Sequence, residues 1–180
     1  VLMGAGTVLC TYAIARRLFA TPAWLAPAAA ALNAFIPQFI FISASINNDA
    51  LATLLSALSL WLLVCIIQDG ASTARLTALG AILGLAALTK LNALVLMPLG
   101  ALVLLVLSWQ RGRKWAFVRW GTWSFAAAAA SGGWWYARNW LLYGDPFGLQ
   151  LMFAVMPVHP ERPTTQRLLQ LLDGALKSFW

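Results

Sequence analysis

Three polar residues, Asn47, Asn48 and Asp49, interrupt a chain that is otherwise strongly apolar, and helix-like sequence resumes at Ala50. Asn and Asp are preferred N-cap residues, so one interpretation is a solvated turn that caps the helix beginning at Ala50. A second interpretation is chemical. Asp49 is then a catalytic base or a ligand of a divalent metal ion, and Asn48 is a substrate ligand beside it. The two interpretations are compatible.

Two cationic residues, Lys90 and Arg138, also lie within apolar or aromatic segments. Lys90 lies between "GLAALT" and "LNALVL", and a charged side chain at the centre of a membrane helix costs about 2.5–3.5 kcal/mol or more. Its ammonium therefore reaches the interface as an anchor or meets an anion such as a lipid phosphate. Arg138 and Asn139 lie within "WWYARNW". Because Arg binds phosphate bidentately and stacks on aromatic rings, Lys90, Arg138 and Asn139 are candidate substrate-binding residues. The aromatic residues alone are more typical of an interfacial belt.

The composition places these residues in a membrane protein. Of the 180 residues, 62% are hydrophobic and 9% are charged, whereas a soluble domain needs a polar surface. The net charge of +7 does not indicate nucleic-acid binding, because the basic residues cluster at the ends of apolar segments. The expected fold is an all-α, polytopic transmembrane helical bundle.

Hydropathy predicts about six spans, at about 1–18, 24–46, 50–68, 76–89, 91–109 and 115–135, within a transmembrane region over residues 1–145. Residues 146–180 are expected to form the start of an extracytoplasmic loop, with an amphipathic interfacial helix over 165–180. The stretch "AAAAASGG" at 126–133 is interpreted as a small-residue helix interface.

The alternation of these spans predicts which charged residues share a side. If Arg16 and Arg17 are cytoplasmic, the basic cluster "RGRK" at 111–114 is cytoplasmic as well, as the positive-inside rule requires. Asp49, Lys90 and Arg138 then all face the extracytoplasmic side. A transporter or flippase-like protein, in which ionisable groups line a path near the middle of the spans, is an alternative. The predicted positions at span ends favour a site at the membrane surface.

Several segments together resemble a known group of enzymes. They are "NAFIPQFIFISASINNDALATLL", "GLAALTKLNALVLMPL", "WWYARNWLLYGDPFG" and "SFW". In this order they look like the GT-C superfamily of integral-membrane glycosyltransferases, nearest to the protein O-mannosyltransferase and aminoarabinose transferase-like branch. The resemblance implies transfer of a sugar from a polyprenyl-phosphate donor to an acceptor on the extracytoplasmic face of a bacterial inner or plasma membrane. A non-catalytic protein on the same scaffold is a further alternative.

The resemblance also implies roles for particular residues. Such enzymes usually carry a catalytic acid in the first external loop and a second acidic motif in the next one. Asp49, in "INND", matches the second motif, although two asparagines precede it where a paired-acid motif would have another carboxylate. The first external loop is not in this sequence, so we expect the chain to be an internal piece of a longer protein and to be inactive alone.

Overall fold

A computed structural model describes residues 1–150 and 173–174 of the chain, and no strand occurs among them. The predicted all-α membrane bundle is confirmed. Most of the interfacial helix expected at 165–180 lies outside the described residues. The elements are α1 (Leu2–Leu18), α2 (Leu25–Ala34), α3 (Pro37–Ala44), α4 (Asp49–Asp69), α5 (Thr73–Thr89), η1 (Leu91–Val95), α6 (Leu96–Gln110), α7 (Ala116–Ala128), the π-helical η2 (Ala129–Gly133) and α8 (Trp134–Tyr143).

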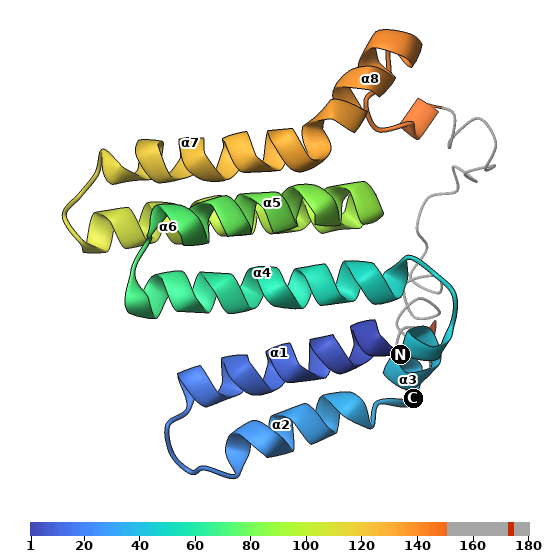
Figure 1. The fold of residues 1–180 in the computed structure, drawn as a ribbon, viewed down its shortest axis with the longest axis vertical. Coiled ribbons are helices and arrows are strands. Elements are labelled where there is room, and N and C mark those ends of the chain that lie inside the picture. Colours follow the sequence, from blue (N-terminus) through green and yellow to red (C-terminus); the bar gives the residue numbers. More distant parts are fainter. Residues whose placement is uncertain (151–172, 175–180) are drawn as a thin grey trace.

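The long helices lie side by side, with α5 between α4 and α7 and with α2 packed on α1 (Figure 1). Because α5 runs antiparallel to α4 and parallel to α7, the last residue of α5 lies at the same end of the bundle as the first residue of α4 and as α8 (Figure 1). The main core lies where α4, α5, α6 and α7 meet. Its buried members are Leu62, Leu63, Ile66, Leu76, Leu79, Leu83, Leu104, Leu107 and Trp120.

Among the described residues, two helical segments are long and apolar enough to cross a membrane. They are α4, with 21 residues, and Leu91–Gln110, with 20 residues. Helices α2 and α3 together would form a third span if they cross the membrane as a single broken segment. The angle between them is 63°. The expected span at 24–46 is thus broken, because Pro37 has no N–H to continue the helix and Ile36 before it is extended. The count of six spans stays a prediction.

The helix that contains the last expected span extends beyond the predicted end of that span. The helical path continues beyond residue 135 through η2 and α8 to Tyr143. It ends where Gly144 adopts a left-handed conformation, with φ of 67°. The sequence between these points contains no strong helix breaker, so an interfacial position alone does not end the helix.

The small-residue interface at 126–133 is confirmed. A Cβ atom on Gly84 would collide with the Ser131 side chain and the Ala128 carbonyl oxygen, and Gly132 lies directly against the Gly84 backbone. Only glycine permits this approach of α5 to α7 and η2. Hydroxyl groups then join the helices, since the side chains of Ser124 and Ser131 donate to α5 carbonyl oxygens at 3.2 and 3.1 Å.

Candidate functional site

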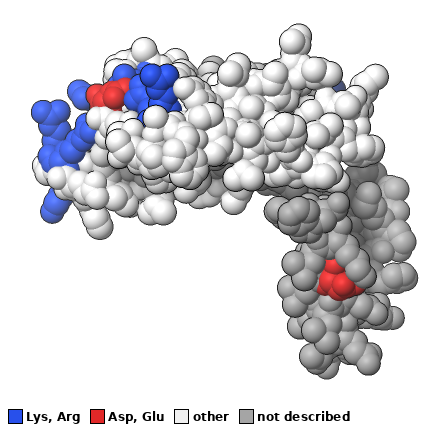
Figure 2. Space-filling model, turned by 90° about the horizontal axis from the view of Figure 1, so that it is seen from below, with Lys and Arg blue, Asp and Glu red and all other residues white. Residues whose placement is uncertain are grey.

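The charged side chains divide between two ends of the bundle. One end, here called the Asp49 end, holds the start of α4, the end of α5 and α8 (Figure 1). The opposite end, the Asp69 end, holds most of the described Lys and Arg residues, which Figure 2 shows gathered on one side of the molecule. The predicted separation of the basic clusters from Asp49, Lys90 and Arg138 is therefore present in the fold.

An ion pair joins the two helices that meet at the Asp49 end. The ammonium of Lys90 donates to Oδ1 of Asp49, with 42% and 36% of the two side chains exposed. Asp49 is the first residue of α4, where the helix dipole favours a carboxylate. Lys90 follows the last residue of α5 in an extended conformation. Residues 41 positions apart in the sequence are thus brought together, because α4 and α5 are antiparallel neighbours.

The two asparagines before Asp49 have different hydrogen-bond partners. The helix begins at Asp49, one residue before the predicted start, and the side chain of its N-cap residue, Asn48, makes no capping bond. The Asn47 side-chain oxygen instead accepts a hydrogen bond from the Ala50 N–H at 3.2 Å, so the turn satisfies an N–H of the first turn through Asn47. The Asn48 amide instead donates to the carbonyl oxygen of Thr89 at 3.0 Å. The start of α4 and the end of α5 are therefore linked twice, by the Asn48 bond and by the Asp49–Lys90 pair.

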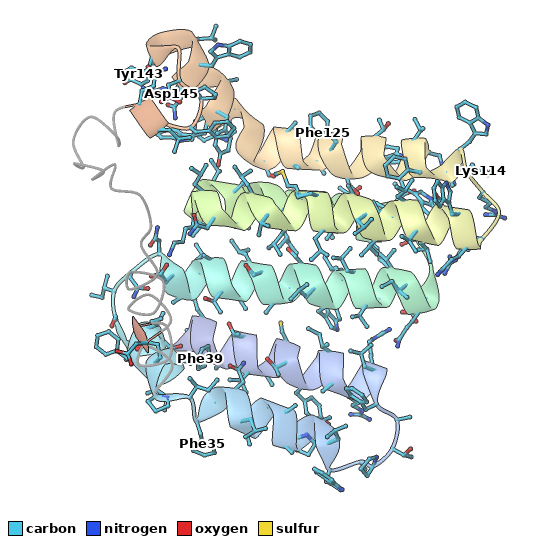
Figure 3. All side chains as sticks on the ribbon, turned by 180° about the vertical axis from the view of Figure 1, so that it is seen from behind. Phe35, Phe39, Lys114, Phe125, Tyr143 and Asp145 are labelled. Atoms are coloured by element: carbon cyan, nitrogen blue, oxygen red, sulfur yellow. The ribbon has the colours of Figure 1, made fainter. Side chains whose placement is uncertain are left out.

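Arg138 and Asn139 lie in a neighbouring hollow. It has a volume of about 650 Å³ and is lined by Trp135, Arg138, Asn139, Tyr143, Asp145, Gly148 and Gln150. The Arg138 guanidinium lies over the Trp135 ring, 5.5 Å from its centre, in the stacking arrangement expected from the sequence. Figure 3 shows Tyr143 and Asp145 close together at the end of α8.

The hollow and the ion pair share one end of the molecule but are not bonded to each other. Within the described residues, no hydrogen bond or ion pair joins Arg138 or Asn139 to Asp49 or Lys90. The link between the two groups is indirect. The hydroxyl of Tyr136, at the start of α8, donates to the carbonyl oxygen of Ala87 near the end of α5 at 2.6 Å.

Asp145 shapes the wall of the hollow. Its carboxylate accepts hydrogen bonds from the backbone N–H groups of Phe147 and Gly148 at 3.0 Å and of Gln150 at 2.7 Å. These hydrogen bonds lower the pKa of Asp145 below its usual value, and the bond from the Gln150 N–H has the largest effect. The carboxylate is thus used to form a turn after α8.

Sequence reasoning missed Tyr136 as a residue that links α8 to α5, whereas stacking of Arg138 on a neighbouring aromatic ring was expected. Tyr136 lies in "WWYARNW", whose aromatic residues alone are interpreted above as an interfacial belt. The Tyr136 hydroxyl could have indicated this role from the sequence, because a partly buried tyrosine usually finds a hydrogen-bond partner.

Divalent cations prefer several oxygen ligands. In the part of the chain that the structure describes, no three His, Cys, Asp or Glu side chains gather to form a metal site. Near Asp49 there is one carboxylate beside an ammonium, and this donor set does not by itself fit such an ion. The metal ion at Asp49 stays a prediction that needs further ligands.

Comparison with known families identifies the class of protein. Residues 1–136 match the family described as dolichyl-phosphate-mannose-protein mannosyltransferase, and the chain belongs to this family. The family supports the resemblance to GT-C enzymes, and it places the chain among integral-membrane glycosyltransferases of the mannosyltransferase type. Searches of curated proteins and of solved structures gave no match.

Proposed function

We propose that the intact protein transfers a sugar from a polyprenyl-phosphate carrier to an acceptor at the Asp49 end, on the extracytoplasmic face of the membrane. The observation that carries this proposal is the half-exposed pair of Asp49 and Lys90 at the end of the bundle opposite the main basic cluster. A carboxylate and a cation at one membrane surface are the two groups that glycosyl transfer from a lipid phosphate requires.

In this proposal the donor phosphate replaces Asp49 as the partner of Lys90. Phosphate is a strong acceptor for an ammonium, and both members of the pair are accessible to solvent. The released Asp49 carboxylate then takes the proton of the acceptor hydroxyl. The acceptor oxygen forms a bond to the anomeric carbon, and the bond from this carbon to the phosphate oxygen breaks. The electron pair leaves with the phosphate, whose charge Lys90 stabilises.

Arg138 and Asn139 supply a second set of contacts. The guanidinium is held over Trp135 and lines the hollow, so a phosphate or sugar entering there meets a positioned cation. The Asn139 amide, half-buried in the same wall, can donate to a sugar hydroxyl or a phosphate oxygen. The bond of Tyr136 to Ala87 keeps this hollow beside the end of α5.

The test measures sugar transfer from polyprenyl-phosphate mannose by the intact protein in membrane vesicles. Asp49→Asn, Lys90→Ala and Arg138→Ala should each lower the rate while the amount of folded protein stays unchanged. Asp69→Asn makes the same chemical change at the other end of α4 and serves as the matched control, with transfer retained. Full activity in all three variants of the Asp49 end would refute the assignment of the site.

A further inference from the structure

A second hollow lies at the Asp69 end, where the connection from α6 enters α7. It has a volume of about 480 Å³ and is lined by Gly112, Arg113, Lys114, Trp115, Ala116 and Arg119. Figure 3 labels Lys114 in this connection, at the end of the molecule opposite Tyr143 and Asp145. Three exposed cationic side chains thus border a single concave surface.

These three cations differ from the other basic residues of the same end. Arg17 and Arg75 both bind the carboxylate of Asp69, at 2.9 and 3.0 Å. Arg111 donates to the carbonyl oxygen of Ile67 at 3.1 Å. Within residues 1–150, by contrast, the side chains of the three cations at the hollow have no hydrogen-bond or ion-pair partner. Their mutual repulsion is relieved when an anion occupies the hollow.

The start of α7 adds to the positive potential. Ala116 is the first residue of this helix, which has 13 residues and no acidic residue in its first turn. A helix N-terminus carries free N–H groups and a partial positive charge, so it favours an anion. The helix dipole and the three side chains therefore act in the same direction.

The position of the hollow indicates an anion that belongs to a lipid. The apolar segment Leu91–Gln110, which is long enough to cross a membrane, ends immediately before it. Trp109 and Trp115, on either side of the connection, are 65% and 86% exposed. Exposed tryptophans at the end of a membrane span are typical of the headgroup region of a bilayer. A position of the three cations near lipid phosphates is consistent with these exposed tryptophans and with the end of the apolar segment.

We propose that this hollow binds the phosphate of an anionic phospholipid, through Arg113, Lys114 and Arg119. The site is separate from the proposed transfer site, because α4 alone places about 30 Å between the two ends of the bundle. It does not depend on the proposed enzymatic function. Bound lipid would stabilise the connection between α6 and α7 and the start of α7.

The experiment measures lipid bound to the purified intact protein by native mass spectrometry, with phosphatidylglycerol, phosphatidylcholine and inorganic phosphate as separate probes. The wild-type protein should retain phosphatidylglycerol in preference to phosphatidylcholine. Each basic residue near an anionic surface contributes enough to change affinity about fivefold, so Arg119→Gln should weaken retention about fivefold and the triple Gln variant about a hundredfold.

The matched control is Arg16→Gln, which removes one charge from a helix at the same end, where Arg16 donates to the Tyr12 hydroxyl at 3.3 Å. This variant should retain phosphatidylglycerol as the wild type does. Equal losses in Arg16→Gln and Arg119→Gln would overturn the proposal, because they would indicate a general effect of net charge. Unchanged retention by Arg119→Gln, or binding of inorganic phosphate with no preference for phosphatidylglycerol, would overturn it as well.

Discussion

The two carboxylates at the ends of α4 are held in different ways. Asp49 is the first residue of this helix and Asp69 is the last. Both side chains are 36% exposed, so solvent access does not distinguish them. Asp69 binds two guanidinium groups, from Arg17 and Arg75, whereas Asp49 binds one ammonium, from Lys90.

The helix dipole explains the difference. A carboxylate is favoured at a helix N-terminus and disfavoured at a C-terminus, by about 0.3–1 kcal/mol in each case. Asp69 lies at the unfavourable end and is accompanied by arginines, one of which also donates to the Gly70 carbonyl oxygen at 2.9 Å. Asp49 lies at the favourable end and has one cationic partner, Lys90. In the proposed function this one partner exchanges with the donor phosphate, whereas Asp69 stays bound to its two arginines.

The largest effect is expected when Asp49→Lys is combined with Lys90→Asp. The exchange keeps one pair of opposite charges but moves the carboxylate away from the start of α4. We expect sugar transfer by the intact protein to fall about a hundredfold or more, as for loss of a general base, with folded protein retained. Transfer rate and size-exclusion profile measure the two properties. Transfer within a few-fold of the wild type would mean that the pair is only a structural link.

The second effect concerns Lys90 as a phosphate ligand. Lys90→Gln should raise the KM for the polyprenyl-phosphate donor about tenfold, because a charge-assisted hydrogen bond is lost. Lys90→Arg should restore most of the affinity, since it keeps the cation. Donor titrations of both variants measure this. An unchanged KM in Lys90→Gln would exclude the proposed exchange of partners.

A smaller effect is expected at the other end of α4. Asp69→Asn should lower the free energy of unfolding by about 1 kcal/mol, because two partly exposed, solvent-screened ion pairs are lost together. Sugar transfer should be unaffected. Denaturant unfolding in detergent measures the change. If this variant lost transfer as strongly as the variants of Asp49, the distinction between the two ends would be wrong.

The smallest effect is expected at Asp145. A lowered pKa means that its contribution to stability is fully present above the ordinary value of about 4 and is lost as the pH falls through the lower folded value. Asp145→Asn should speed amide hydrogen exchange of Phe147, Gly148 and Gln150 at pH 7. At low pH the wild type should approach the variant. Equal exchange at pH 7 would show that the carboxylate does not hold the turn.

The sequence predicted which charged residues share an end of the bundle better than it predicted the limits of the helices. Counting spans was enough to place Lys90 on the same side as Asp49, because each crossing reverses the direction of the chain, but it did not predict their ion pair. The number of spans did not predict the bend before Pro37. A proline can also lie in an unbroken membrane span when neighbouring helices satisfy the freed backbone groups, so the residue type alone does not decide. The helix that contains the last expected span continues to Tyr143, because the aromatic segment contains no residue that stops a helix. The limit of the span itself stays a prediction.

The sequence alone determined the membrane class, the helical fold and the end of the bundle at which each charged residue lies, because hydropathy and chain direction depend only on residue order. Only the tertiary structure decided the contacts. Asn48 reaches Thr89, and Tyr136 binds the Ala87 carbonyl oxygen of α5, which the glycines bring close to α7 and η2. Helix rotation depends on side-chain packing between distant segments, and a hydropathy pattern does not encode it.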